Sequence, residues 1–434
     1  MKIVFLLHNA YAIGGTVRTT LNLASALADH HDVEIASMAR HLEEPRFEVD
    51  PRVTLVPLVD IRPYSPDLRD PAQAQPATDF PTEDKRHRQY SRLTDLRVRE
   101  YLACCDADVV IGTRPGINVY VSRFAPRRAL RIAQEHLRHD AHSKQLRKVL
   151  ARHYRTLDAV VATTRADAAV YRARMKLPGV RVMSVPNIVP EAQVAPSDVT
   201  APVIAAAGRL ARGKRFDLLL EAFARVAAKE PDWQLRIYGG GKQQERLEGL
   251  VQELRLTDRA HLMGPHTPIE EEFARASIVV SASDAESFGM TLVEAMRCGV
   301  PVVSTDCPLG PAEIITDGVD GRLVPVDDPH ALAEAILDLT ADPSLRRAMG
   351  RAALASAHRY DPAPIATKYE YLFAELRETR LQRTWEREST RAKGWLRRRV
   401  RTWKRATPAP FRGAGLSHMR LRRAGASNHS QRAA

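Results

Sequence analysis

Four charged residues in the second half of the chain have types and a spacing that suit a phosphate-linked sugar. Arg209 follows an apolar run and Lys214 lies five residues beyond it. Glu286 and Glu294 enclose seven residues further on. A guanidinium chelates phosphate with a planar fork and an ammonium adds a point charge, so both would stabilise a departing nucleoside diphosphate. Carboxylates accept hydrogen bonds from vicinal hydroxyls, which suits ribose or a hexose.

Glycine-containing turns are predicted next to these residues. Gly289, Met290 and Thr291 lie where a loop enters a helix, so their N–H groups are expected to face a phosphate. Gly14 and Gly15 stand in the same relation to the first predicted helix of the chain. For these two glycines a plain tight turn is the alternative interpretation, because the full dinucleotide-binding glycine pattern is missing.

The second half of the chain resembles the retaining enzymes of glycosyltransferase family 4, which have the GT-B fold. The resemblance rests on Gly208-Arg209-Leu210 with Lys214, and on the segment from Ser283 to Met296. It covers residues 200–360 well and residues 1–190 more weakly. It implies that Glu294, in the first turn of a helix, holds the ribose, and that Glu286 holds the transferred sugar. It places these residues at the donor: Gly14, Gly15, Gly208, Gly239, Gly264, His266, Phe288, Gly289, Met290 and Thr291.

The first half offers two further candidates, both directly after predicted strands, where doubly wound sheets bind ligands. His136 follows the strand 130–133, and the family resemblance implies a position close to the donor sugar. Arg114 follows the strand 109–112, and its charge suits an acidic or phosphorylated acceptor. The alternatives are a structural histidine and a surface arginine at a helix terminus.

The acidic residues have two competing interpretations. Glu286 and Glu294 could be the acid and nucleophile of a glycosidase, but a glycosidase does not need the neighbouring cations. Asp106-Ala107-Asp108 matches a metal-binding motif of another glycosyltransferase fold, yet no other hallmark of that fold accompanies it. We therefore expect neither a bound metal nor a cofactor besides the donor, for which a UDP-sugar is the expected compound.

Short apolar, β-branched runs alternate with helical patterns over the first 360 residues, which predicts right-handed βαβ units and parallel sheets. The alternation restarts after Pro186-Asn187, so the sequence predicts an α/β, GT-B architecture of two doubly wound Rossmann-like domains with a cleft between them. The predicted boundaries are an acceptor-side domain 1–187, a nucleotide-sugar domain 188–361, a helix 362–379 that crosses back to the first domain, and a basic tail 380–434. The polar, proline-containing stretch 59–92 is predicted to be a long loop or a mobile insertion.

The net charge of +13 comes from the C-terminal tail, because residues 380–434 hold 16 of the 65 Lys and Arg but only 2 of the 52 Asp and Glu. Trp385, Trp395 and Trp403 lie in this tail. Its apolar residues recur every three or four positions, as in Ala392, Trp395, Leu396, Val400 and Trp403. This predicts a basic amphipathic helix that binds an anionic membrane surface, followed by disorder after Ala406. A polyanionic acceptor is the alternative partner, and no DNA-reading motif supports nucleic acid.

The compartment follows from three observations. The apolar run Lys2–Leu7 is short and lacks a cleavage site, so it is interpreted as a buried strand and not as a signal peptide. The 4 Cys include no Cys-x-x-Cys pair, which indicates a reducing environment. With the tail, this predicts a cytoplasmic protein peripheral to the inner face of the membrane.

The sequence thus predicts a retaining transfer of a hexose-type sugar to a hydroxyl by front-side displacement. Tyr11 to Thr19 and Asp306 to Glu313 loosely resemble enzymes that glycosylate teichoic acids, which makes a cell-envelope or polymer acceptor the expectation. The alternatives are a nucleotide-sugar epimerase of the same fold and a non-catalytic carbohydrate- or membrane-binding protein.

Overall fold

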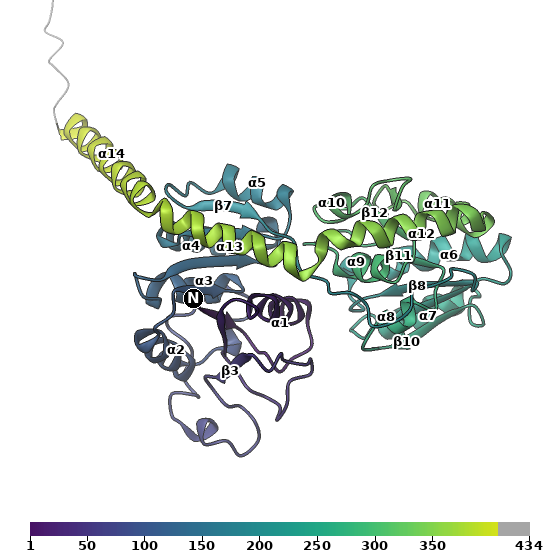
Figure 1. The fold of residues 1–434 in the computed structure, drawn as a ribbon, viewed down its shortest axis with the longest axis horizontal. Coiled ribbons are helices and arrows are strands. Elements are labelled where there is room, and N and C mark those ends of the chain that lie inside the picture. The colour runs from purple at the N-terminus through teal and green to yellow at the C-terminus, as the bar shows by residue number, and fades with distance from the viewer. Residues whose placement is uncertain (407–434) are drawn as a thin grey trace, which may run out of the picture. The chain divides into compact units, whose positions relative to one another are not determined.

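The computed structural model describes residues 1–406, with side chains described through Lys393 and at Trp395. Residues 1–387 form one compact unit, and a second begins at Glu388. The first unit contains two parallel β-sheets, each covered by helices (Figure 1). None of the helices in the described part of the chain is both long and apolar enough to cross a membrane.

The first sheet has seven parallel strands in the order β3-β2-β1-β4-β5-β6-β7. These strands are β1 Lys2–Leu7, β2 Asp32–Ser37, β3 Val53–Pro57, β4 Val109–Gly112, β5 Leu130–Glu135, β6 Ala159–Ala162 and β7 Arg181–Ser184. The helices between them are α1 Gly15–Leu27, α2 Arg92–Cys104, α3 Pro115–Phe124, α4 Lys144–His153 and α5 Arg165–Arg174. Continuous apolar strands form the centre because helices cover both faces of the sheet.

The second sheet has six parallel strands in the order β10-β9-β8-β11-β12-β13. They are β8 Val203–Ala207, β9 Gln234–Tyr238, β10 Ala260–Gly264, β11 Ile278–Ser281, β12 Val302–Thr305 and β13 Gly321–Val324. The helices are α6 Phe216–Lys229, α7 Gln244–Glu253, α8 Glu270–Phe273, α9 Met290–Arg297, α10 Pro311–Ile314, α11 Pro329–Ala341 and α12 Pro343–Ala357. The predicted pair of Rossmann-like sheets is confirmed.

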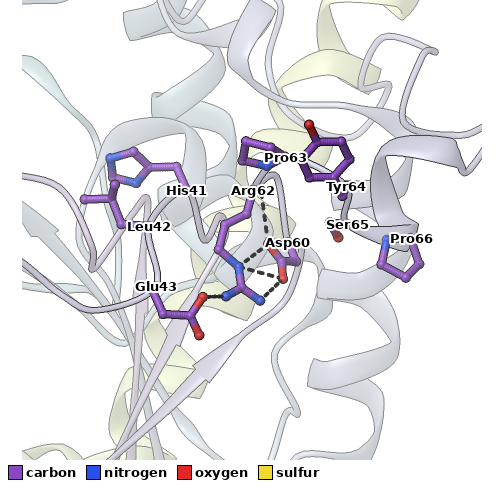
Figure 2. Close-up of a pocket in the computed structure, with 9 residues that line it drawn as sticks. All are labelled: His41, Leu42, Glu43, Asp60, Arg62, Pro63, Tyr64, Ser65 and Pro66. Atoms are coloured by element: carbon purple, nitrogen blue, oxygen red, sulfur yellow. Dashed lines mark hydrogen bonds and ion pairs between the residues drawn. The ribbon is translucent and has the colours of Figure 1, made fainter.

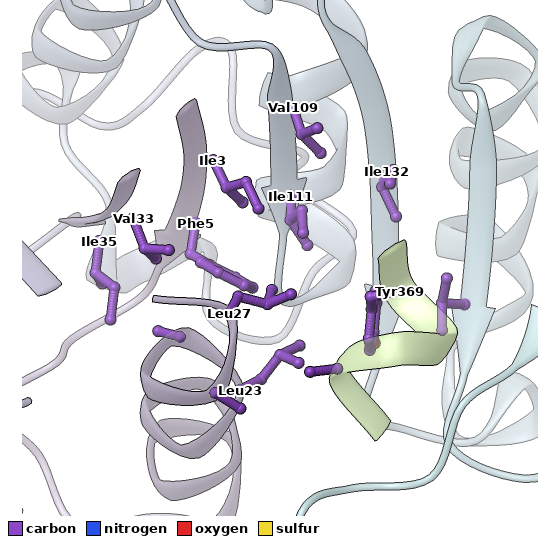
Figure 3. Close-up of a cluster of buried hydrophobic side chains, with 14 of the residues drawn as sticks. Ile3, Phe5, Leu23, Leu27, Val33, Ile35, Val109, Ile111, Ile132 and Tyr369 are labelled. Carbon is purple, nitrogen blue, oxygen red and sulfur yellow. The ribbon is translucent and has the colours of Figure 1, made fainter. Parts of the chain in front are cut away.

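Helix α13 (Pro362–Glu378) returns from the second sheet to the first. Its buried residues join the core built on β1, β2, β4 and β5, where Tyr369 lies near Ile132 (Figure 3). The Gln134 side-chain amide donates to the Tyr369 hydroxyl at 2.7 Å. The first sheet is therefore completed by a helix that comes after the whole second sheet in the sequence.

The stretch between β3 and α2 is packed, contrary to the alternative of a mobile insertion. It contains two 3-10 turns, Pro66–Arg69 and His87–Gln89. The buried carboxylate of Asp95 accepts backbone N–H groups from Thr78, Asp79 and Phe80 at 2.6–3.3 Å. The Phe80 ring stacks on Tyr90 with centroids 3.6 Å apart. Backbone hydrogen bonds to a buried acid hold this polar segment, and hydrophobic periodicity does not reveal such bonds.

The predicted tail helix is present as α14 (Arg380–Ala406), and it starts further inside the fold than expected. Arg383 donates to the buried carboxylate of Asp158 at 2.7 Å, and Arg387 lies 3.3 Å from the same oxygen. The start of α14 therefore belongs to the first unit. The side chains of Leu396, Val400 and Trp403, and the disorder predicted beyond Ala406, lie outside the described residues.

Candidate functional site

Arg209 and Lys214 lie just beyond the end of β8. Lys214 closes a 3-10 turn, Arg212–Lys214, and its Nζ donates to Oε1 of Glu286 at 2.5 Å. Arg209 is exposed, and its side chain makes no hydrogen bond or ion pair with a described residue. The guanidinium is therefore available to an anionic ligand, whereas the ammonium is already shared with a carboxylate.

Glu286 is held between the loops that follow β11 and β12. Its Oε1 also accepts from the Ser283 hydroxyl at 2.7 Å. Its backbone N–H donates to Pro308 at 3.0 Å, and its carbonyl accepts from Leu309 at 3.2 Å. The side chain is 14% exposed. A carboxylate fixed in this way and still open to solvent can accept hydroxyl groups without reorganisation.

Helix α9 begins where the sequence predicts it. Gly289 precedes the helix with φ 106°, in the left-handed region that favours glycine. The helix starts at Met290, so Thr291 lies in its first turn, with N–H groups that lack helical partners. Glu294 is the fifth residue of α9 and therefore lies in the second turn, not in the first as predicted.

Glu294 is buried, and burial raises the pKa of its carboxyl group to about 7. The strongest opposing influence is Arg18, whose Nη1 donates to Oε1 of Glu294 at 2.9 Å. Arg18 lies in α1, so this ion pair joins the first half of the unit to the second. The residue predicted to bind ribose thus already has a cationic partner.

Arg18 is a candidate site residue that the sequence analysis did not assign. Its other Nη atom pairs with Glu270 at the start of α8. One oxygen of Glu270 is buried without a hydrogen-bond partner in the described structure. The sequence feature that could have identified Arg18 is its position, because it lies one helical turn after Gly14-Gly15 and on the same side of α1. Its partners are about 250 to 276 residues away in sequence, so no local pattern revealed them.

Three glycine turns at the ends of β8, β9 and β10 are linked through their backbones. The N–H of Gly208 donates to Tyr238 at 2.9 Å, and that of Gly239 donates to Gly264 at 2.8 Å. A Cβ at Gly239 would lie 1.8 Å from the carbonyl oxygen of Gly208. Close backbone packing therefore accounts for the glycine at position 239.

The other predicted donor residues near the start of α9 differ in what they contact. Gly14 precedes α1, and a Cβ at Gly15 would lie 4.0 Å from Sδ of Met290, so the N-termini of α1 and α9 are neighbours. Two helices of eight or more residues thus direct the positive ends of their dipoles to one region. Phe288 is buried edge-on against Tyr360, which indicates a packing role for its ring.

His266 lies beside the side chains that follow β10. Its Nε2 is 3.7 Å from Glu271, and its ring packs edge-on against Tyr238. The side chain thus has protein partners of its own. A contact to the nucleotide base would run through backbone groups, as the family resemblance implies.

His136 follows β5, and burial lowers its pKa to about 4. Its Nε2 lies 3.4 Å from the Gln134 side-chain oxygen, and its Nδ1 is buried without a partner among the described residues. At neutral pH the imidazole is uncharged. It can therefore exchange a hydrogen bond with a ligand hydroxyl but does not supply positive charge.

A basic group gathers at the carboxyl ends of β1 and β4. Arg114 precedes α3 and lies 3.4 Å from the Asp84 carboxylate, while its Nε is buried without a partner in the described residues. Burial, together with the positive charges of Arg114 and Arg86, lowers the pKa of His8 to about 3. The positive charge of Arg209, in the second half of the unit, contributes to lowering the pKa of Arg86. Three arginines around one strand edge create a positive potential suited to an anionic ligand.

Asp106 and Asp108 are not gathered as metal ligands. They precede β4, at the amino edge of the sheet, whereas the candidate residues follow the carboxyl ends of the strands. Asp106 pairs with Lys2 at 2.7 Å, and Asp108 pairs with Arg377 at 3.0 Å. Each carboxylate thus has a structural partner.

The two halves also meet at α5. Oε1 and Oε2 of Glu313, at the start of α10, each accept a backbone N–H from the first turn of α5, at 2.8 Å, from Ala166 and Arg165. The Thr163 hydroxyl donates to the carbonyl of Ser287 at 2.6 Å. A carboxylate at a helix N-terminus is stabilised by two bonds and by the helix dipole.

Residues 190–355 match the model of the family described as glycosyl transferases group 1. The chain is 35% identical over 393 residues to an exopolysaccharide phosphotransferase of Streptomyces coelicolor. The matched region is 87% of this chain but only 41% of that protein. It is 26% identical over 386 residues to an amylovoran biosynthesis glycosyltransferase of Erwinia amylovora, covering 85% of this chain and 98% of that one. The family match and these names support transferase activity.

The structure resembles TarM of S. aureus, solved with fondaparinux, alpha-GlcNAc-glycerol and UDP. The TM-score is 0.69 at 16% identity, over 86% of this chain and 99% of that one. At this identity the likeness concerns the fold, which is GT-B.

Proposed function

We propose that this chain is a retaining family 4 glycosyltransferase that moves a hexose-type sugar from a nucleoside-diphosphate sugar to a hydroxyl of a cell-envelope or polymer acceptor. The observation that carries the proposal is the ion pair of Lys214 with Glu286, which acts on Glu294 of α9, whose N-terminus adjoins that of α1. Arg209 lies on the same loop after β8 as Lys214. Positive charge and helix termini suit a diphosphate, and fixed carboxylates suit the hydroxyls attached to it. The names of the relatives support a polymer acceptor.

In the proposed reaction the bond from the sugar to the diphosphate breaks, and the acceptor hydroxyl attacks the same face of the sugar. Arg209 and Lys214 stabilise the charge that develops on the leaving phosphate. Glu286 orients the transferred sugar, and neutral His136 exchanges a hydrogen bond with one of its hydroxyls. The departing phosphate accepts the proton of the acceptor hydroxyl, so no protein side chain needs to form a covalent intermediate.

The donor test uses thermal stabilisation of the full chain by UDP, GDP and ADP, and by their sugars. We expect UDP compounds to raise the melting temperature, because a ligand bound only to the folded state stabilises it by mass action. Incubation of the sugar donor alone should return no epimer. Release of an epimerised sugar without acceptor, or no stabilisation by any of the nucleotides, would contradict the proposal.

Metal removal gives a second expected result. Excess EDTA should leave sugar transfer within about twofold of its untreated rate, since two cations and two helix termini act on the leaving group where a metal would act by charge stabilisation. The rate of UDP release measures this. Abolished activity that Mn²⁺ or Mg²⁺ restores would contradict the expectation and would make Asp106 and Asp108 the residues to replace next.

We further propose that the tail binds the inner face of an anionic membrane. The described part of α14 exposes Trp385 and Trp395, at 69% and 53%, amid its basic residues. A protein ending at Arg387 should stay folded, because it keeps the ion pairs to Asp158. A protein ending near Leu376 would lose both ion pairs and leave that buried carboxylate without them, so we expect it to be less stable than the protein ending at Arg387.

The expected result is that the full chain sediments with vesicles containing phosphatidylglycerol and that the protein ending at Arg387 does not. High salt should weaken the binding, because it screens the arginine charges, while burial of Trp side chains leaves a residual part. Neutral phosphatidylcholine vesicles are the control. Equal sedimentation of both proteins would exclude residues 388–434 as the membrane-binding element.

A further inference from the structure

A pocket of about 520 Å³ opens beside the carboxyl ends of β2 and β3 (Figure 2). It is built from the loop that follows β2 and from the start of the long segment that follows β3. None of its residues belongs to the candidate site described above.

Tyr64 gives the pocket an exposed aromatic wall. Its side chain is 91% exposed, and it stands next to Pro63 at the rim (Figure 2). Its φ of 69° places a bulky residue in the left-handed region, which is a strained backbone conformation for a side chain of this size. A rigid, amphipathic ring in this position offers an apolar face for the C–H surface of a sugar at a small cost in side-chain entropy.

The charges of the pocket are paired within the protein. The Arg62 guanidinium donates to both oxygens of Asp60, at 2.6 and 3.0 Å, and also to Glu43. His41 shares a hydrogen bond of 2.9 Å with Asn9. Glu43 also pairs with Arg40 at 3.1 Å, so two carboxylates face two arginines and the pocket offers no surplus positive charge to a phosphate. Fixed carboxylates retain lone pairs for hydroxyl donors, and a neutral polyhydroxyl ligand therefore fits this chemistry best.

The strand order places this pocket next to the candidate site. β2 lies between β3 and β1, while the loops after β1, β4 and β5 carry Gly14, Arg114 and His136. Arg40, adjacent to the pocket residue His41, lies over the Tyr11 ring with its Cζ 5.4 Å from the centroid. Burial raises the pKa of the Tyr11 hydroxyl, while the charges of Arg40 and Arg62 oppose that shift. Tyr11 therefore interacts electrostatically with Arg62 of the pocket. One continuous edge of the sheet thus runs from the pocket to the proposed reaction centre.

We propose that this pocket binds an uncharged sugar unit of the acceptor, at a distance from the hydroxyl that receives the transferred sugar. The inference rests on the proposed function, because an acceptor with several sugar units is what gives a second, remote subsite a use. Tyr64 packs on the sugar ring, and the carboxylates of Asp60 and Glu43 accept its hydroxyls. Binding there lengthens the contact with a polymer without adding a group to the reaction centre.

The test measures binding of three neutral hexasaccharides, maltohexaose, cellohexaose and N-acetylchitohexaose, to the full-length protein by saturation-transfer NMR and titration. We expect at least one of them to bind at millimolar concentration. Tyr64→Ala should weaken that binding about tenfold, the size of one aromatic contact, and Tyr64→Phe should restore it to within about twofold. Tyr371→Ala is the matched control, since Tyr371 is 73% exposed on α13, away from the pocket.

The proposal would be overturned if the wild type and Tyr64→Ala bound a hexasaccharide equally. It would also be overturned if the wild type bound none of the hexasaccharides at 10 mM, a concentration that corresponds to a binding free energy of about 2.7 kcal/mol. UDP stabilisation is measured on the same samples. Hexasaccharide binding that depends on Tyr64 but occurs without any nucleotide binding would leave the pocket intact and refute the transferase proposal. Nucleotide binding without hexasaccharide binding would do the reverse.

Discussion

Replacing Arg209 or Lys214 with alanine is expected to lower kcat/KM for sugar transfer by about 10²-fold or more, the loss typical of one preorganised oxyanion-type donor. The Arg209 side chain has no hydrogen bond or ion pair among the described residues, so its removal breaks none. Lys214→Ala also releases Glu286 from its ion pair, although the Ser283 hydroxyl still holds that carboxylate. Steady-state kinetics with the donor that stabilises the protein gives the measurement.

Arg212→Ala is the control for both variants. Arg212 lies in the same 3-10 turn as Lys214 and is exposed, and its side chain has no hydrogen bond or ion pair to a described residue. It removes one positive charge from the same turn, so unchanged kinetics in this variant would attribute the loss to position and not to net charge. If Arg209→Ala and Lys214→Ala turned over normally, the assignment of the leaving-group site would be wrong.

Glu294→Gln is expected to weaken binding of the nucleoside diphosphate about tenfold, because an amide accepts the ribose hydroxyls less strongly than a carboxylate. The raised pKa of about 7 adds a pH dependence. As the pH falls below about 7 the wild-type carboxylate takes up a proton, so wild-type affinity should fall towards that of the variant. Calorimetric titration at several pH values measures both effects, and Glu334→Gln on α11 is an exposed control.

The same group should leave a signature in stability. The carboxyl group of Glu294 binds its proton more tightly in the folded state, with a pKa of about 7, than in the unfolded state, near 4.5. Its contribution to stability is thus full below pH 4.5 and is lost as the pH rises to about 7, at a slope of about 1.4 kcal/mol per pH unit. The free energy of unfolding of Glu294→Gln should lack this component. Identical pH profiles for the two proteins would contradict the assigned pKa.

The individual strands that the sequence predicted, such as Lys2–Leu7 and Val109–Gly112, lie inside the first sheet, and the edge strands β7, β10 and β13 are not among them. The central strands are continuous apolar runs such as Val109–Gly112, because helices cover both of their faces. Arg181–Ser184 and Ala260–Gly264 lie at sheet edges and include polar or partly exposed residues, so their pattern is weaker. Hydrophobic periodicity reports burial, and burial is incomplete at an edge.

The candidate site was predictable where its residues act from one short segment. Arg209, Lys214 and the run around Glu286 lie close to strand ends and helix starts, which sequence patterns locate well. Arg18 and Arg86 were missed because their partners lie in the other half of the unit or across the sheet edge. Such pairs depend on how the two sheets face each other, and no spacing within one segment encodes that arrangement.

The position of α13 has a consequence for the order in which the protein matures on the ribosome. Its apolar residues complete the core of the first sheet, yet they are translated about 180 residues after the last strand of that sheet. At typical elongation rates this delay is roughly 10 to 40 s. During that time the apolar residues that α13 covers in the finished core stay exposed, which favours chaperone binding and aggregation. Synonymous codon changes that slow elongation between residues 190 and 360 would therefore lower the yield of folded protein without changing its sequence.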